Sequence, residues 1–303
     1  MSVKVDSLTK IYGSQRAIDS ISFEVKSGEI VGFLGPNGAG KSTTMKIISC
    51  FTLPTSGNAF VNGIDILTDP VEIRRNIGYL PEHNPLYEDM YVREYLFFIA
   101  QLHKISGSYS KRVSEMIELT GLTPERHKKI QELSKGFKQR VGIAQALIHN
   151  PDVLLLDEPT SGLDPNQVVD IRKLIVDIGK TKTVILSSHI MQEVQAMCNR
   201  VIIINEGKIV ADDKTESLVA KTDKGILIQV EFKKAIKRAD LNKLKGLIHA
   251  ENQQGKWLLK LNDIKSREFV FEFAVQTGNT ILEMSPIREN LEQVFQQITN
   301  TKQ

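Results

Sequence analysis

The sequence predicts an α/β protein with a parallel-sheet core, followed by a small α+β module. Four short segments, at residues 30–34, 153–156, 183–187 and 201–204, consist mainly of apolar residues. Continuous apolar runs of this length are typical of parallel strands that helices bury on both faces. The chain of 303 residues is also long enough for two domains, each with its own core.

Taken in chain order, the first apolar strand stops at a glycine and leads into a helix over residues 42–49. Residues from about 90 to 150 differ, because their apolar positions have helical spacing and no strong strand intervenes. We therefore expect a helical insert there. The strand at 153–156 follows a Pro-Asp pair, and the two later apolar strands complete the sheet.

A charged turn at residues 222–225 predicts a boundary between domains of residues 1–221 and 222–303. The C-terminal order predicts a ferredoxin-like α+β module, because strand, helix, strand, strand, helix and strand follow one another. The expected strands are 226–232, 247–252, 256–261 and 280–284, and the expected helices are 239–245, 266–277 and a final one at 288–299.

Composition and charge exclude several classes of protein. A net charge of +3 is too small to indicate a nucleic-acid partner. The two cysteines, Cys50 and Cys198, form no disulfide framework and fit a reducing compartment. The N-terminal segment lacks the apolar core of a signal peptide, and no run of about 18 apolar residues occurs. We therefore expect no direct membrane span, so that any membrane role comes through a partner.

A glycine-rich loop, residues 35–42, joins the first apolar strand to the following helix. Its sequence, Gly-Pro-Asn-Gly-Ala-Gly-Lys-Ser, has the spacing of a phosphate-binding loop in the strand–loop–helix context that supports the assignment. Glycines let backbone N–H groups turn toward phosphates, and the helix N-terminus favours negative charge. Lys41 is expected to reach the β- and γ-phosphates, and Ser42 to bind Mg²⁺. A glycine-rich turn with a surface lysine is the alternative.

An acidic pair, Asp157-Glu158, ends the apolar strand at 153–156. On its own such a pair is more often a helix cap or a solvated turn. Together with a phosphate-binding loop it predicts catalysis: Asp157 would hold Mg²⁺, directly or through water, and Glu158 would polarise the attacking water.

Several segments, in this order along the chain, resemble the nucleotide-binding subunits of ABC transporters: residues 35–43, 133–140, 153–159, 161–164 and His189. The resemblance covers about residues 1–220. It implies a P-loop NTPase fold of ABC type, with an N-terminal antiparallel β part, a parallel-sheet core and a helical subdomain at about 90–150. It also implies ATP hydrolysis with Mg²⁺, and a dimer in which two copies of the chain enclose two ATP molecules.

The resemblance implies a role for each matching residue. Tyr12 would stack on adenine, unless it is an ordinary strand aromatic. Ser134 and Gly136 would touch the γ-phosphate held by the other copy, and Asp164 would lie in the loop that couples the two sites. His189 would sense the γ-phosphate and act in catalysis with Glu158 and Lys41. The residues implied to surround the phosphates are Gly35, Pro36, Asn37, Gly38, Ala39, Gly40, Lys41, Ser42 and Thr43.

The sequence departs from the family pattern at two places. The signature usually reads Ser-Gly-Gly-Gln, and here Lys135 and Phe137 replace its second and fourth residues. Lys135 could add positive charge near the phosphate or point to solvent. Glu82 stands where the family usually has a glutamine, and its carboxylate can still accept Mg²⁺ or a water. The expected Mg²⁺ set is therefore Ser42, Asp157 and Glu82. The remaining histidines show no metal-ligand spacing.

Within the family, residues 79–87, 190–194 and 291–295 resemble ATP-binding subunits of ABC-2-type exporters, and among these the gliding-motility-associated ATPases of Bacteroidota. We therefore expect a subunit that energises a separate transmembrane exporter from the cytoplasmic face of the inner membrane, docked to permease subunits near residues 82–98. One alternative is a soluble ABC ATPase acting on ribosomes or DNA repair, which usually has two fused halves or a long coiled-coil insert. The other is a nonhydrolysing regulatory module, against which Glu158 and His189 argue.

Overall fold

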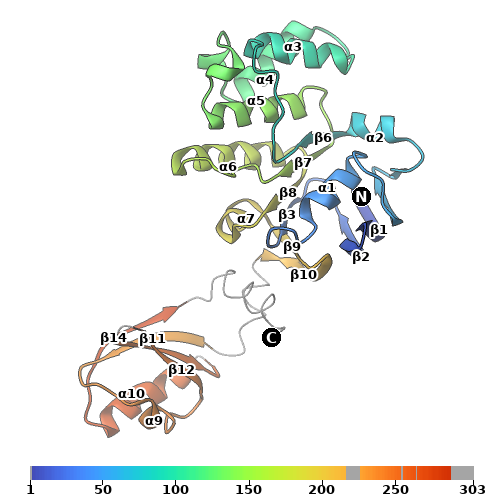
Figure 1. The fold of residues 1–303 in the computed structure, drawn as a ribbon. Helices are drawn as coiled ribbons and strands as arrows, with labels where there is room; N and C mark the ends of the chain where they lie inside the picture. The colour runs from blue at the N-terminus through green and yellow to red at the C-terminus, as the bar shows by residue number, and fades with distance from the viewer. Residues whose placement is uncertain (1, 216–225, 254, 264, 288–303) are drawn as a thin grey trace. The chain divides into compact units, whose positions relative to one another are not determined.

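The computed structural model of the chain describes residues 2–215, 226–253, 255–263 and 265–287 (Figure 1). The chain forms two compact units, Met1–Thr215 and Glu216–Gln303. The predicted boundary at 221/222 and the predicted helix at 288–299 lie outside the described residues. No helix among the described residues is both long and apolar enough to span a bilayer.

The first unit is built around a six-stranded sheet, and the four predicted apolar runs form four of its strands. Its strands, in sheet order, are β10 (Lys208–Lys214), β9 (Arg200–Asn205), β3 (Ile30–Leu34), β8 (Thr183–Ser188), β7 (Val153–Asp157) and β6 (Ile77–Leu80). All neighbours are parallel except β10, which runs antiparallel to β9 at the edge. Every residue of β3, β7 and β8 is buried, which explains why these strands read as continuous apolar runs.

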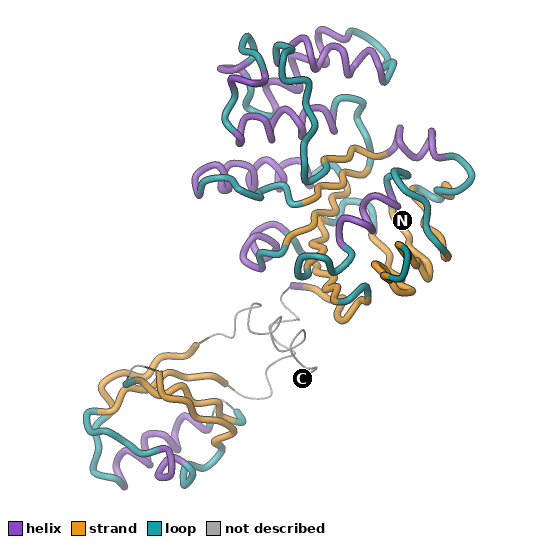
Figure 2. The backbone as a smooth tube through the Cα atoms, viewed as in Figure 1, coloured by secondary structure: helices purple, strands orange, loops and turns teal. Residues whose placement is uncertain are grey.

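A second, antiparallel sheet carries the N-terminal part of this unit. Its order is β2 (Gln15–Val25), β1 (Val3–Tyr12), β4 (Ser56–Val61) and β5 (Ile64–Asp65). Helix α1 (Lys41–Ile48) lies between the two sheets, so that Val5, Met45 and Leu155 belong to one apolar core. Helices α6 (Pro165–Gly179) and α7 (Met191–Met197) cover the other face of the central sheet (Figure 2).

The helices between β6 and β7 form a layer beyond the edge strand β6 (Figure 1). They follow the short helix α2 (Pro70–Asn76), which precedes β6. The layer consists of α3 (Val92–Leu102), α4 (Tyr109–Leu119), two 3₁₀ turns (Thr123–Glu125 and Ile130–Glu132) and α5 (Lys135–Leu147).

Helix α5 approaches β6 closely because two glycines lie between them. A Cβ atom on Gly78 would lie 2.1 Å from the carbonyl oxygen of Ala146, and one on Gly142 would lie 2.4 Å from Asn84 Nδ2. A glycine in a helix interior costs about 1 kcal/mol relative to alanine. Here the close packing of helix on strand offsets that cost.

The second unit follows the predicted order of elements. It contains β11 (Ile226–Phe232), α9 (Arg238–Leu241), β12 (Leu247–Gln253), β13 (Lys256–Leu261), α10 (Ser266–Gln276) and β14 (Ile281–Ile287). The strands form an antiparallel sheet in the order β12-β13-β11-β14. The helix predicted at 239–245 is shorter in the structure and ends at Leu241. From there the chain continues in turns that end at Gly246, which has φ +77°.

Candidate functional site

Two positions in the loop between β3 and α1 fit only glycine. A Cβ atom on Gly35 would lie 2.3 Å from the carbonyl oxygen of Ile204. Gly40 has φ +110°, and a Cβ there would lie 2.6 Å from the carbonyl oxygen of Ala17. Lys41 begins α1 and donates from Nζ to the carbonyl oxygens of Gly35 (2.8 Å) and Pro36 (3.1 Å). The loop therefore holds the lysine ammonium in place through two of its carbonyl oxygens.

The carboxylate of Asp157 lies at the end of β7, beside the start of α1. It is 1% exposed and accepts hydrogen bonds from Ser42 Oγ (3.0 Å) and Ser187 Oγ (2.6 Å). Mg²⁺ prefers oxygen ligands and takes only one or two from a protein beside substrate phosphates. The hydroxyl of Ser42 and the carboxylate of Asp157 fit that requirement. No cluster of three or more His, Cys, Asp or Glu side chains suited to a metal occurs among the described residues.

Glu158 follows Asp157 in a left-handed backbone conformation, with φ +49°. Such a conformation costs about 1–3 kcal/mol for a residue other than glycine. The backbone N–H of Glu158 donates to Ser187 Oγ (3.0 Å), and the Glu158 side chain is only 8% exposed. Glu158 Oε1 lies 3.5 Å from Lys41 Nζ, and Oε2 lies 2.9 Å from His189 Nδ1. The three residues predicted to be catalytic thus lie in direct contact.

These side chains open onto a cavity of about 550 Å³. This volume is within the usual range of roughly 300–1,000 Å³ for small-molecule sites. The cavity is lined by Asn37, Gly38, Gly40, Lys41, Ser42, Thr43, Glu82, Glu158, Ser161 and His189. All of these except Ser161 are sequence-predicted site residues. Glu82 reaches the cavity from the segment after β6, and its role toward Mg²⁺ stays a prediction.

Eight predicted site residues do not line this cavity. Gly35, Pro36, Ala39 and Asp157 belong to the loop and the strand end described above, whereas Tyr12, Ser134, Gly136 and Asp164 lie elsewhere. Tyr12 lies at the β1–β2 turn, 47% exposed, with Lys10 Nζ 4.9 Å from its ring centre. Ser134 and Asp164 cap helices: Ser134 Oγ accepts from the N–H of residue 137 at the start of α5, and Asp164 accepts from two N–H groups of α6. A Cβ on Gly136 would lie 2.6 Å from Gln167, so the starts of α5 and α6 pack together.

The side chain of Lys135 lies across the loop at 161–164. A Cβ atom added to Gly162 would lie 2.1 Å from Lys135 Nζ. The sequence left open whether this lysine points to a phosphate or to solvent. In the structure it packs on Gly162 and so connects the signature segment to the loop that carries Asp164.

A buried carboxylate that sequence reasoning missed connects the segment after Glu158 to the segment before His189. Glu193 on α7 is 3% exposed and accepts hydrogen bonds from the hydroxyls of Thr160 and Ser188, the latter at 3.1 Å. Thr160 follows Glu158 by two residues, and Ser188 precedes His189. The other carboxylate oxygen of Glu193 lies 4.0 Å from Arg172 Nη2. The sequence offered one signal for this role: Glu193 lies in a helix among the apolar residues Met191, Val194 and Met197, which are buried in the structure.

Replacing Glu193 by alanine should lower the ATPase kcat by about tenfold to a hundredfold, since small displacements of catalytic groups cost up to roughly 10²-fold. Glu193→Gln should recover part of this loss, because its amide oxygen can still accept from the two hydroxyls. Affinity for ATP should stay near wild type. The matched control is Glu115→Gln on exposed α4. An unchanged kcat in a folded Glu193→Ala protein would show that the network does not position the catalytic loops.

Comparisons with known proteins agree with this geometry. The ABC transporter family model matches residues 18–161. The bacitracin transport ATP-binding protein BcrA of Bacillus licheniformis is 39% identical over 75% of this chain and 74% of its own length. The linearmycin resistance ATP-binding protein LnrL of Bacillus subtilis is 35% identical over 82% of this chain and 81% of its own. A solved ATP-binding cassette dimer in a post-hydrolysis state with ADP and Pi aligns at a TM-score of 0.65, with 29% identity, over 70% of this chain and 98% of that one.

Proposed function

The chain belongs to the family of ABC transporter ATP-binding subunits, which hydrolyse ATP, and we propose that it powers a separate transmembrane exporter. The observation that carries this proposal is the contact of Lys41, Glu158 and His189 at one cavity. Export is favoured because relatives are named for bacitracin transport and linearmycin resistance.

In the proposed reaction, the backbone N–H groups of the glycine-rich loop and Lys41 hold the phosphates of ATP. Ser42 and Asp157 hold Mg²⁺, which neutralises charge on the phosphates when it is bound. Glu158 accepts a hydrogen bond from the attacking water and polarises it. The contact with His189 Nδ1 fixes the orientation of this carboxylate. The products are ADP and phosphate. This arrangement favours hydrolysis over a nonhydrolysing regulatory module.

The proposal includes a second copy of the chain that completes each site. Ser134, Gly136 and Asp164 lie outside the cavity of their own chain, at the packed starts of α5 and α6. In the proposed sandwich dimer Ser134 and Gly136 touch the γ-phosphate held by the other copy, and Asp164 lies in the loop that couples the two sites. The similar solved cassette, which is dimeric, supports this arrangement. Tyr12 is proposed to stack on adenine, which its 47% exposure allows.

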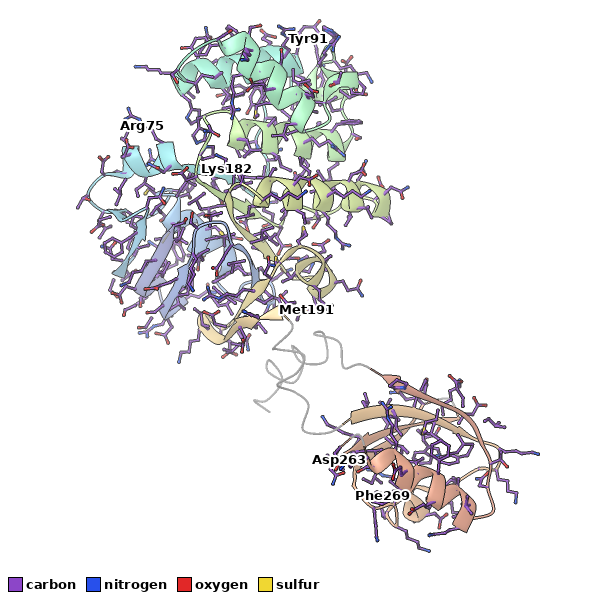
Figure 3. All side chains as sticks on the ribbon, turned by 180° about the vertical axis from the view of Figure 1, so that it is seen from behind. Arg75, Tyr91, Lys182, Met191, Asp263 and Phe269 are labelled. Atoms are coloured by element: carbon purple, nitrogen blue, oxygen red, sulfur yellow. The ribbon has the colours of Figure 1, made fainter. Side chains whose placement is uncertain are left out.

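We place the contact with the transmembrane partner on residues 82–98, called the docking surface below. Two of its rings are largely exposed, Tyr87 by 59% and Tyr91 by 48%, whereas Tyr95 is buried; Tyr91 lies at the outer edge of the helical layer (Figure 3). Exposed aromatic groups are typical of interface centres. Asn84 Nδ2 donates to the carbonyl oxygen of Lys138 (2.8 Å), and Lys138 Nζ lies 2.6 Å from Glu88. Partner movement can therefore reach α5 and its signature residues through direct contacts.

Replacing Tyr87 and Tyr91 together with aspartate should detach the chain from its membrane partner and leave the ATPase activity of the isolated chain unchanged. The reason is that two carboxylates would replace apolar contact area. Sedimentation with membranes of cells that express the partner measures the effect. The control is Val210→Asp, at an exposed position of β10. If the double variant still sediments fully, the docking surface lies elsewhere.

Finer assignments extend the same proposal. The element order and the sheet order of the second unit support a ferredoxin-like module. The ABC-2 and gliding-motility assignments rest on sequence resemblance, and its segment at 291–295 lies outside the described residues. Peripheral attachment at the cytoplasmic face of the inner membrane follows from a membrane partner. Affinity purification from membranes, with mass-spectrometric identification of bound chains, tests these assignments. Recovery of ribosomal or repair proteins in place of a membrane subunit would contradict them.

A further inference from the structure

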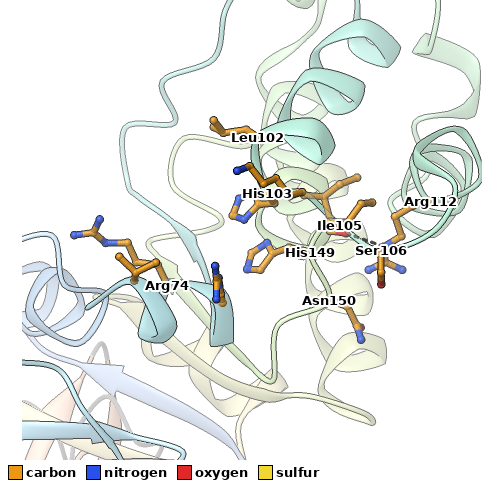
Figure 4. A pocket seen from close by; sticks show the side chains of 12 residues that line it. Arg74, Leu102, His103, Ile105, Ser106, Arg112, His149 and Asn150 are labelled. Carbon is orange, nitrogen blue, oxygen red and sulfur yellow. Dashed lines mark hydrogen bonds between the residues drawn. The ribbon is translucent and has the colours of Figure 1, made fainter. Parts of the chain in front are cut away.

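A few buried polar atoms of the described residues have no hydrogen-bond partner: Tyr79 Oη, His149 Nδ1, Glu158 Oε1, Arg172 Nε and Arg267 Nε. Leaving such an atom unpaired costs free energy, so each one points to a partner that arrives later or to a separate role. His149 borders a cavity of about 850 Å³ that shares no lining residue with the nucleotide cavity (Figure 4). Glu158 already acts in the proposed hydrolysis. Tyr79 Oη is a donor that the proposed mechanism does not use.

Tyr79 lies on β6, on the face of the sheet that packs against α1. Its ring packs on the core that contains Met45 and Leu155. Tyr79 is in register with Leu155 on β7, so Asp157 lies two residues farther along the same face. The pKa of Tyr79 is raised above its usual value, first by burial and then by the negative charges of Asp157 and Glu82. The hydroxyl is therefore a neutral donor beside the carboxylates of the predicted magnesium site.

Glu82 is the complementary group, an acceptor without a donor. It follows Tyr79 by three residues, is exposed, and lines the nucleotide cavity. Its carboxylate has neither a hydrogen bond nor an ion pair within the part of the chain that the structure describes. Asp157 differs, because its Oδ1 already accepts from Ser42 and Ser187 and it ends a buried strand. Glu82 lies beyond the end of β6, so its side chain has more freedom to reach the hydroxyl.

We propose that Tyr79 is a positioning residue for the magnesium site: when Mg²⁺ and nucleotide occupy the cavity, its hydroxyl donates to the carboxylate of Glu82 and so orients that side chain. Filling the cavity removes water from Glu82, and a hydrogen bond to a carboxylate strengthens as water leaves. The same bond offsets part of the charge that Glu82 adds beside Asp157 and Glu158. The inference rests on the proposed function, because it requires Mg²⁺ and nucleotide in this cavity.

Tyr79→Phe should weaken binding of the non-hydrolysed ATP analogue AMP-PNP by about tenfold or more when Mg²⁺ is present, as expected for the loss of a hydrogen bond to a charged group. In EDTA the variant and the wild type should bind the analogue equally, because Glu82 then has no cation to hold. Calorimetric titration of the full chain measures both affinities. The control Tyr109→Phe removes the same hydroxyl from a ring that packs on Phe97, away from the cavity. It should bind as the wild type does in both conditions.

Thermal melting separates this role from a structural one. Without nucleotide, Tyr79→Phe should melt at the wild-type temperature or above it, because the substitution removes a buried hydroxyl that has no partner. With Mg²⁺ and AMP-PNP, the increase in melting temperature should be smaller in the variant than in the wild type. A hydroxyl that only supports the fold would give the opposite pattern: a lower melting temperature without nucleotide and the same increase on binding. That pattern would overturn the proposal.

A double-mutant cycle with Glu82→Ala tests the acceptor. Without the Glu82 carboxylate, Tyr79→Phe should change the affinity for AMP-PNP with Mg²⁺ by less than about twofold, because two residues that act through one contact are not additive. An equal loss with and without Glu82 would assign the hydroxyl to another acceptor and refute the proposed pairing. If the wild type binds AMP-PNP with Mg²⁺ and Tyr79→Phe binds it equally well, the inference fails and the proposed function stands. If the wild type does not bind it, the proposed function itself fails.

Discussion

Replacing Glu158 by glutamine should leave ATP binding intact and reduce hydrolysis by about 10²- to 10⁴-fold, the usual contribution of a general base. The amide cannot accept a proton from water, although it fills the same space between Lys41 and His189. Single-turnover hydrolysis of labelled ATP measures the loss. Glu206→Gln is the matched control, since Glu206 is exposed and has a similar left-handed backbone, with φ +47°.

The same variant should accumulate as a dimer with ATP and Mg²⁺, because the closed sandwich no longer reopens through hydrolysis. Light scattering should then give twice the monomer mass with ATP and the monomer mass with ADP. A monomer at saturating ATP would count against the two-copy site built from Ser134 and Asp164. Normal hydrolysis by Glu158→Gln would remove Glu158 from the mechanism.

Replacing Lys41 by alanine should weaken ATP binding by at least about a hundredfold. Loss of one member of a buried charge pair costs roughly 2–5 kcal/mol, and every 1.4 kcal/mol is a factor of ten in affinity. Lys41 is 5% exposed and is the cation enclosed by the loop, so no neighbouring side chain replaces it there. Calorimetric titration with ATP measures the effect.

The control for this prediction is Lys46→Ala, which removes a lysine from the same helix but away from the loop. Thermal melting of both variants separates loss of binding from loss of folding, because Lys41→Ala also leaves Glu158 without its cation. Wild-type affinity in a folded Lys41→Ala protein would mean that the loop does not bind the phosphates.

The four inner strands, β3, β7, β8 and β9, were predictable because they are buried on both faces, so local composition alone identifies them. The edge strands were not, because β6 has only four residues and the residues of β10 alternate between exposed and half-buried. The residues that line the nucleotide cavity were also predictable, because most of them lie in one short loop and at one strand end. The stacking of His103 on His149 was not predictable, because the two residues are distant in sequence and meet only in the folded chain. Glu193 was missed for the same reason: its partners come from two other loops.

The glycines between α5 and β6 limit how this protein can be recombined with its relatives. Gly78 and Gly142 let β6 and α5 pack so closely that neither position has room for even one methyl group. A chimera that exchanges the helical layer alone would place a foreign α5 on a native β6, and one alanine at either position would force the two apart. A segment exchanged between relatives should therefore begin before Gly78 and end after α5, so that both the helix and the strand come from the same protein.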